Sequence, residues 1–280
     1  MKETITPTEE TSPTTPWGEK IAMKLPKVLV PALRYMYLTA RLIIPACIYS
    51  IRLLSNPRLI KFVIPWATSN LTSDRSPLKD EAPWVTFEAK EWLKEFLGRE
   101  MTIFEYGSGG STIFFSKRVS TTISVEHDHA WYRHVSETLK EKNISNCNCL
   151  LLEPQPGLDG TSNFADPESF ASREYANMNF EAYVKSIDSF PDESFDLVFI
   201  DGRARPSCIL RAVTKVRPGG FLMLDNSDRP YYLRGKELLV NWQRTDFFGP
   251  WPYGRYFWQT SIWKKPLDLS KQKRNRPGVG

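Results

Sequence analysis

Short apolar segments alternate with helix-like segments from about residue 81 to about residue 266, and this alternation constrains the fold more than any other feature. Segments such as FDLVFID at 195–201 place apolar side chains on both faces of a strand, which is typical of a parallel sheet covered by helices on both sides. The sequence therefore predicts a doubly wound α/β domain. Strands are predicted at 102–106, 121–126, 147–153, 195–201 and 220–225, with a hairpin of two strands after 245, and helices at 86–98, 111–118, 129–141, 178–187, 206–216 and 232–243.

Composition divides the chain around this domain. Residues 1–16 are predicted to be a disordered leader, 17–65 a basic, apolar helical extension, 66–80 a polar linker, 81–266 the α/β domain and 267–280 a basic tail.

The four cysteines form no CxxC pair, so the sequence predicts neither a zinc ribbon nor a disulfide scaffold. The first ten residues are polar, acidic and rich in threonine, unlike a secretory signal. We therefore expect a cytoplasmic protein.

The net charge of +5 is unevenly distributed along the chain. Residues 17–65 carry a net +7 and 264–280 a net +5, which leaves 66–263 with a net −5 once the −2 of residues 1–16 is counted. An acidic body is not typical of a nucleic-acid-binding domain, so no nucleic acid partner is expected. The basic flanks favour an anionic surface, and membrane lipid is the simplest candidate.

Three arginines mark the apolar extension. Arg34, Arg41 and Arg52 share one helical face within about 20° at 100° per residue. A spanning helix would bury Arg41 near its centre at about 2.5–3.5 kcal/mol, whereas an interfacial helix leaves basic side chains at the headgroups. We predict peripheral membrane association on the cytoplasmic face; a spanning helix, or a helical subdomain packed on the domain, are the alternatives. Pro31 and Pro45 predict an interrupted or kinked helix.

A glycine-rich turn follows the first predicted strand, where open α/β sheets bind ligands. The dinucleotide pattern GxGxxG is not met, because Thr112 stands at the third glycine position after Gly107 and Gly109. Glu105 would repel a pyrophosphate and instead favours a cationic ligand that bears an ammonium and a sulfonium. Glu126 ends the second predicted strand, 19 residues after Gly107, and is placed to bind two ribose hydroxyls.

These features resemble the class I S-adenosylmethionine-dependent methyltransferases, and in particular their O-methyltransferase branch. The resemblance covers roughly 81–266 and is carried by ExGxGG at 105–110, Glu126, FDLVFIDG at 195–202 and RPGGFLMLDN at 217–226. It implies a seven-stranded sheet of order 3-2-1-4-5-7-6 with an antiparallel seventh strand. It also implies bound S-adenosyl-L-methionine, with His127 or Asp128 near the adenine. The expected cofactor residues are Glu105, Gly107, Ser108, Gly109, Glu126, His127 and Asp201.

Oxygen-bearing side chains end two neighbouring predicted strands. Asp201 ends the fourth, and Asp225 and Asn226 end the fifth. Hard oxygen ligands suit Mg²⁺ or Mn²⁺, and these positions look like the metal triad of the catechol-type O-methyltransferases. The alternative is that the side chains cap the following loops and helices.

The predicted catalytic set is Asp201, Arg203 and Arg205. That family's catalytic lysine lies three residues past the first aspartate, where this chain has Ala204. Arg203 and Arg205 cannot act as bases, because a guanidinium stays protonated. They would either bind an acidic or phosphorylated acceptor or pair with nearby carboxylates.

The sequence thus predicts a methyltransferase, with O-methylation of a small-molecule, glycan or lipid-linked acceptor that the residues do not identify. Two alternatives stand beside it. One is an inactive methyltransferase-like scaffold at a membrane, which the lack of an assignable base favours. The other is a nicotinamide-dependent oxidoreductase, against which the broken third glycine and Glu105 both count.

Overall fold

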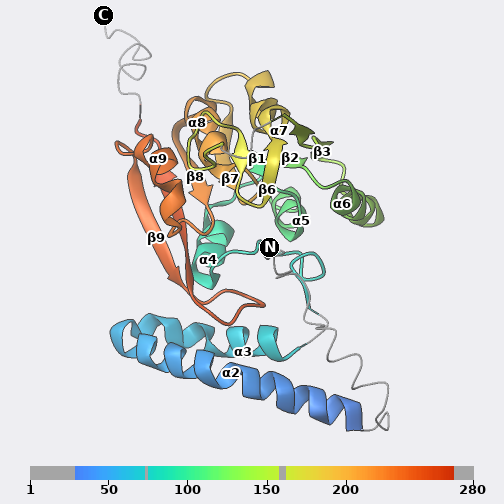
Figure 1. Cartoon of the computed structure of the whole chain (residues 1–280), viewed down its shortest axis with the longest axis vertical. Helices are drawn as coiled ribbons and strands as arrows, with labels where there is room; N and C mark the ends of the chain where they lie inside the picture. Colours follow the sequence, from blue (N-terminus) through green and yellow to red (C-terminus); the bar gives the residue numbers. More distant parts are fainter. Residues whose placement is uncertain (1–28, 73–74, 158–161, 268–280) are drawn as a thin grey trace, which may run out of the picture. The chain divides into compact units, whose positions relative to one another are not determined.

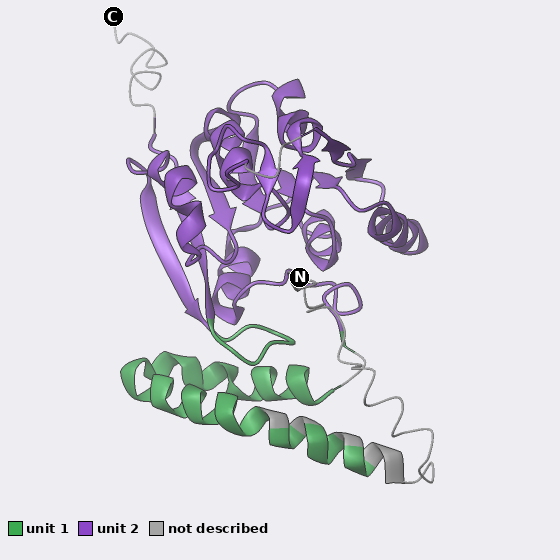
Figure 2. Ribbon diagram, in the orientation of Figure 1, with its two compact units in different colours: residues 1–75, 250–257 green, residues 76–249, 258–280 purple. Residues whose placement is uncertain are grey.

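The computed structural model describes residues 29–72, 75–157 and 162–267. Two compact units divide the chain: unit 1 comprises 1–75 and 250–257, and unit 2 comprises 76–249 and 258–280 (Figure 2). The predicted leader and nearly all of the predicted basic tail lie outside the described residues.

Unit 2 is built on a seven-stranded sheet of order β3-β2-β1-β7-β8-β10-β9 (Figure 1). Counted within this sheet alone, the order is 3-2-1-4-5-7-6. Strand β10 pairs antiparallel with β8 and β9, while the other pairs are parallel. The predicted fold class and strand order are therefore confirmed. The strands span β1 Thr102–Tyr106, β2 Thr121–Glu126, β3 Cys147–Leu151, β7 Phe195–Ile200, β8 Val216–Leu224, β9 Gln243–Gly249 and β10 Trp258–Lys264.

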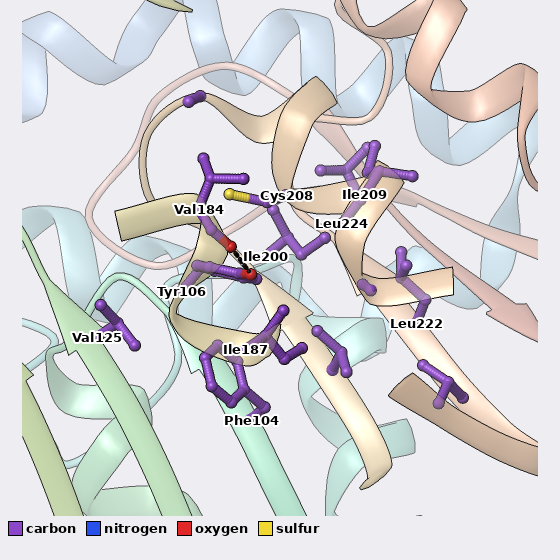
Figure 3. Packing of buried hydrophobic residues seen from close by; sticks show 14 of the residues in the cluster. Phe104, Tyr106, Val125, Val184, Ile187, Ile200, Cys208, Ile209, Leu222 and Leu224 are labelled. Atoms are coloured by element: carbon purple, nitrogen blue, oxygen red, sulfur yellow. Dashed lines mark hydrogen bonds between the residues drawn. The ribbon is translucent and has the colours of Figure 1, made fainter. Parts of the chain in front are cut away.

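Two hydrophobic clusters cover the two faces of this sheet, because its strands carry apolar side chains on both sides. On one face, Phe104, Val184 of α7 (Glu181–Lys185) and Cys208 of α8 (Arg205–Lys215) belong to one cluster (Figure 3). On the other face, Ile103 packs with Leu93 of α4, together with residues of α5. The helices of unit 2 span α4 Phe87–Phe96, α5 Gly110–Ser116, α6 His129–Glu141, α7 Glu181–Lys185, α8 Arg205–Lys215 and α9 Leu233–Glu237.

The register of the parallel strands brings their carboxyl ends to one edge. Tyr106 at the end of β1 lies opposite Ile200 of β7, and Ile200 lies opposite Leu224 of β8. The residues that follow these ends, including the glycine turn, Asp201 and Asp225, therefore meet at the edge where open α/β sheets bind ligands.

Two stretches of unit 2 differ from the predicted elements. The polar stretch 154–176 contains most of a second sheet of order β4-β6-β5, formed by β4 Gln155–Pro156, β5 Ala171–Ser172 and β6 Tyr175–Asn179. The predicted helix at 232–243 is shorter: a 3₁₀ turn at Pro230–Tyr232 leads into α9, which ends at Glu237. A glycine at 235 weakens this helix, because glycine loses more backbone entropy on folding than other residues.

Unit 1 contains α2 (Leu29–Ser55), a 3₁₀ turn at Pro57–Phe62 and α3 (Val63–Leu71), together with residues 250–257. Trp66 explains why α3 continues into the segment predicted as a linker. Its ring is buried, its centroid lies 5.1 Å from that of Tyr49, and its Nε1 donates to Gly254 O at 2.8 Å. An anchored aromatic side chain outweighs the low helix preference of the neighbouring Thr, Ser and Asn.

Helix α2 continues through Pro45, so the interruption that was one of the two predicted possibilities does not occur there. Among the residues that the structure describes, no helix combines the length and the apolar character needed to cross a membrane.

Candidate active site

The glycine turn after β1 is shaped by close backbone contacts. Gly107 has a φ of +95°, and a Cβ there would lie 2.8 Å from Gly202 Cα, so the turns after β1 and β7 touch through two glycines. A Cβ at Gly110 would lie 2.0 Å from a backbone oxygen. At Gly109, in contrast, it would meet nothing closer than Trp131 at 3.9 Å. A ligand can therefore approach the backbone of the turn at Gly109.

Glu105 lies under this turn and is completely buried. Its Oε2 accepts hydrogen bonds from Thr112 Oγ1 (2.6 Å) and Ser124 Oγ (2.7 Å), whereas its Oε1 has no hydrogen-bond partner in the structure. Thr112 Oγ1 also accepts from Gly109 N at 2.9 Å, so the residue that breaks the dinucleotide pattern ties the turn to the carboxylate. Burial raises the pKa of Glu105 to about 7, although the hydroxyl groups of Ser111, Thr112 and Ser124 act in the opposite direction. A cation at Oε1 would satisfy the free oxygen and stabilise the charge.

Glu126 ends β2 and is also buried. Its Oε2 accepts from the backbone and hydroxyl of Ser108 (3.0 and 2.9 Å), and its Oε1 accepts from the backbone N–H groups of His127 (2.8 Å) and Asp128 (2.9 Å). Burial alone would raise the pKa of Glu126, but the side chain of His127 and these N–H groups outweigh it, and the net shift is downward. Glu126 therefore stays ionised at neutral pH.

His127 links Glu126 to an aromatic cluster. Its Nδ1 lies 2.7 Å from Glu126 Oε1, and its Nε2 lies 3.0 Å from Tyr175 Oη of the small sheet. Its ring also packs near those of Phe180 and Tyr183. Sequence reasoning named His127 but could not place β6 beside it, because the contact joins residues 48 apart.

Trp131 is a residue that sequence reasoning missed. It lies in the first turn of α6, which Asp128 caps by accepting from Trp131 N at 2.7 Å. Its indole Nε1 donates to Ser108 O at 2.8 Å, which places the ring over the glycine turn. The available signal was an aromatic residue one helical turn after a capping aspartate that itself follows β2.

The predicted metal triad surrounds a guanidinium. Arg205 donates from Nη2 to Asp201 Oδ1 (2.9 Å), and from Nη1 to Asp225 O (2.5 Å) and Asn226 Oδ1 (3.4 Å). The Asp225 carboxylate accepts a further hydrogen bond from Thr260 Oγ1 at 2.6 Å. Thr260 belongs to β10, and no pattern in the sequence pointed to it.

The two aspartates of this group differ in exposure. Asp225 is 1% exposed, and its pKa is raised by burial and by the charge of Asp201. The side chain of Asp201 is 22% exposed, and burial raises its pKa although Arg205 acts in the opposite direction. Asp201 N donates to Tyr106 O at 3.0 Å, which joins this group to the end of β1 and the glycine turn that follows it.

Arg203 pairs with a carboxylate outside the triad. Its Nη1 lies 3.6 Å from Glu174 Oε2, and its guanidinium lies 5.5 Å from the centroid of the Tyr175 ring. The two predicted arginines therefore differ: Arg205 is buried and binds the strand ends, while Arg203 is partly exposed beside them.

The strand order of the large sheet distinguishes this fold from the dinucleotide-binding fold. The dinucleotide-binding fold has the order 3-2-1-4-5-6, whereas here a seventh strand lies antiparallel between the fifth and the sixth. The chain has the class I methyltransferase fold. Glu105 lies on β1 and Glu126 on β2, while Asp201 follows β7 and Asp225 follows β8.

No protein-family model and no curated protein matches the sequence. Solved structures do match. A methyltransferase-like protein from Silicibacter pomeroyi is 21% identical, with 69% of this chain and 95% of that chain covered and a TM-score of 0.42. The O-methyltransferase TomG from Streptomyces achromogenes, in complex with SAM, is 15% identical over 71% and 93% of the two chains, with a TM-score of 0.47. An rRNA methylase from Streptococcus thermophilus is 11% identical over 70% and 100%, with a TM-score of 0.42.

Proposed function

We propose that the chain is an S-adenosylmethionine-dependent methyltransferase that methylates an oxygen of its acceptor. The observation that carries this proposal is the buried carboxylate of Glu105, whose Oε1 has no hydrogen-bond partner beside a turn open at Gly109. A buried polar atom without a partner is costly unless a ligand supplies one. The ammonium of the cofactor's amino-acid part meets that need.

The other cofactor residues fit the same ligand. Glu126 is ionised and its carboxylate is an acceptor for ribose hydroxyls, with the Ser108 hydroxyl as the contact that a ligand displaces most easily. His127 and Trp131 offer ring surfaces beside it for the adenine. These roles are assigned from donor and acceptor chemistry.

The residues after β7 hold the acceptor and remove its proton. Bound S-adenosylmethionine supplies an electrophilic methyl group, which the acceptor oxygen takes as the carbon–sulfur bond breaks and the bonding pair stays on sulfur. Asp201 accepts the hydroxyl proton, since its raised pKa makes it a stronger base than a surface aspartate. Arg205 orients Asp201 through the hydrogen bond at Oδ1 and is thus a positioning residue.

The predicted metal site does not fit a metal ion. Asp201 Oδ1 and Asn226 Oδ1 accept from the Arg205 guanidinium, and Asp225 Oδ1 accepts from Thr260. A cation is already built into the site, so we derive no step through a metal. In the described part of the chain, no group of three or more His, Cys, Asp or Glu side chains could hold one either.

Calorimetry with S-adenosylhomocysteine tests the cofactor assignment. Glu126→Gln should weaken binding by about 1.5–3 kcal/mol, because a hydrogen bond to a charged group is lost. The matched control is Glu181→Gln, an exposed glutamate of α7. Equal affinities in all three proteins would remove Glu126 from the site. Equilibrium dialysis in which NAD⁺ binds and S-adenosylhomocysteine does not would favour the oxidoreductase, and cofactor binding without label transfer to any acceptor would favour the scaffold.

We also propose that unit 1 binds an anionic membrane surface. Large apolar side chains on α2 are exposed at Met36 (65%), Ile43 (61%), Ile44 (69%), Ile51 (66%) and Leu54 (85%). At 100° per residue these positions lie within an arc of about 100°, so they form one apolar stripe. The net charge of +7 in residues 17–65 favours anionic lipid over a second copy of the same basic segment.

Co-sedimentation of the full chain with vesicles tests this surface. The protein should sediment with phosphatidylserine-containing vesicles more than with phosphatidylcholine alone, and Ile44→Glu/Ile51→Glu should reduce sedimentation at least tenfold. Val240→Glu is the control, because Val240 is an exposed apolar residue of unit 2 (78%). A wild type that forms dimers in solution and ignores vesicles would show that a second copy covers the stripe.

A further inference from the structure

A pocket beside Asp201 concentrates arginines. It is formed by the start of α8 after β7, by residues 229–232 after β8, and by part of the segment 164–174. Its charged lining consists of Arg173, Arg203, Arg205, Arg229 and a single carboxylate, Glu174. None of these side chains belongs to the residues assigned to the cofactor.

The carboxylates near the pocket do not balance its guanidinium groups. Glu174 is shared, with Oε2 at 3.6 Å from Arg203 and Oε1 at 4.0 Å from Arg229. Arg205 is paired with Asp201. Arg173 lies over the ring of Tyr231, 5.3 Å from its centroid, and within the described residues no carboxylate lies within 4.0 Å of it.

Glu174 is ionised and still leaves an excess of positive charge. Burial would raise its pKa, but the charge of Arg203 lowers it, and the net shift is downward. One negative charge thus faces three guanidinium groups, those of residues 173, 203 and 229. Like charges held together raise the energy of the pocket unless an anion joins them.

The type of residue indicates the type of anion. A guanidinium presents a planar set of donors that matches the oxygens of a carboxylate or a phosphate in a bidentate manner. The pocket also contains the first turn of α8, which has no side-chain cap and adds the positive end of a helix dipole. The neutral part of the acceptor would contact Tyr231 and Tyr232, which also line the pocket.

We propose that the acceptor carries an anionic group, a carboxylate or a phosphate ester, which binds to Arg173, Arg203 and Arg229 and holds the reacting hydroxyl at Asp201. This inference rests on the proposed methyltransferase function and names its substrate class. The arginines hold the acceptor by its anionic group. This places the reacting hydroxyl at the adjacent Asp201, which accepts the proton.

Binding of inorganic phosphate to the full chain, saturated with S-adenosylhomocysteine, tests the pocket without knowledge of the acceptor. Thermal stability is measured against phosphate concentration at constant ionic strength, and acetate serves as the carboxylate probe. At least one of the two anions should stabilise the wild type, and Arg203→Gln/Arg229→Gln should weaken its binding at least tenfold. The matched control is Arg217→Gln, because Arg217 is the second residue of β8, at the amino end of the strand and away from the pocket, and pairs with Asp196.

The outcomes separate the two proposals. If neither anion binds, or if the double variant binds both as the wild type does, the anionic pocket is refuted even when S-adenosylhomocysteine binds normally. If S-adenosylhomocysteine does not bind, the methyltransferase proposal fails, and the anion titration is then read on the unliganded protein.

Label transfer identifies the source of the anionic group. The wild type is incubated with methyl-labelled S-adenosylmethionine and with either the water-soluble or the lipid extract of cells, and products are separated by anion exchange. Label retained on the resin from the aqueous extract indicates a soluble anionic acceptor, and from the lipid extract an anionic lipid. Label that appears only in the unretained fraction of both would overturn the proposal.

Discussion

Replacement of Glu105 by glutamine should change the pH dependence of stability in a way that the burial of this carboxylate determines. The pKa of Glu105 is raised from 4.5 to about 7 in the folded protein. The folded state therefore binds more protons than the unfolded state between these values, and stability must fall as the pH rises through this window. With 1.36 kcal/mol for each pKa unit, the wild type should lose about 3 kcal/mol between pH 4.5 and pH 8 through this group.

Glu105→Gln removes this loss while it retains the acceptor for Thr112 and Ser124. The amide oxygen replaces Oε2, and the amide nitrogen takes the position of the oxygen without a partner. Any cost of burying that nitrogen is independent of pH, so it shifts the whole curve and leaves the slope unchanged.

Urea denaturation at pH 5, 6, 7 and 8 measures the effect. The difference in unfolding free energy between variant and wild type should move in favour of the variant by about 2.5 kcal/mol from pH 5 to pH 8, because a small part of the loss has already occurred at pH 5. Saturating S-adenosylhomocysteine should abolish the trend in the wild type, because its ammonium stabilises the ionised carboxylate, and the variant should bind this ligand at least tenfold more weakly. Parallel curves for the two proteins across this range would refute the reasoning.

Three further outcomes follow from the same edge of the sheet. Gly110→Ala should destabilise unit 2 by about 1–3 kcal/mol or more, because its Cβ would meet a backbone oxygen at 2.0 Å. Gly109→Ala should change the melting temperature by about one degree or less but weaken cofactor binding, because the space at its Cβ is open. Arg205→Met should destabilise by about 3–5 kcal/mol in urea denaturation at pH 8, since Asp201 loses its partner. The loss should be smaller at pH 5, because burial raises the pKa of Asp201 and so favours its neutral form as the pH falls. An equal loss at both pH values would argue against the ion pair. Methyl transfer by the wild type should be unchanged after treatment with EDTA, and a loss restored by Mg²⁺ would reinstate the metal.

The large sheet could be predicted because its strands are continuous apolar segments whose burial on both faces leaves little choice of structure. β6 could not, since its sequence, YANMN, has neither apolar alternation nor β-branched residues and forms a strand only because β4 and β5 pair with it. The length of α3 was likewise hidden, because Trp66 binds a residue 188 positions away.

The candidate site divides in the same manner. Glu105 and Glu126 could be found because each stands next to a strand end, where local sequence determines position. For Arg205 the sequence left two roles open, acceptor binding or pairing with carboxylates, because its partners Asp225 and Asn226 follow another strand, and only the register of β7 and β8 brings them together. The residue types suit a metal, whereas in the structure Asp201 and Asn226 accept hydrogen bonds from the guanidinium of Arg205.

Unit 1 combines an early segment of the chain with residues 250–257, and this has a consequence during synthesis. Tyr49 and Trp66 leave the ribosome early, but Trp66 finds its acceptor at Gly254, and Tyr49 packs on Phe257 with centroids 5.1 Å apart. At a translation rate of about 5–20 residues per second, the 188 residues between Trp66 and Gly254 take about 10–40 s to appear. For that interval the nascent helices display aromatic side chains that the finished protein covers, and a chaperone or a lipid surface would encounter them before the loop that completes the unit exists.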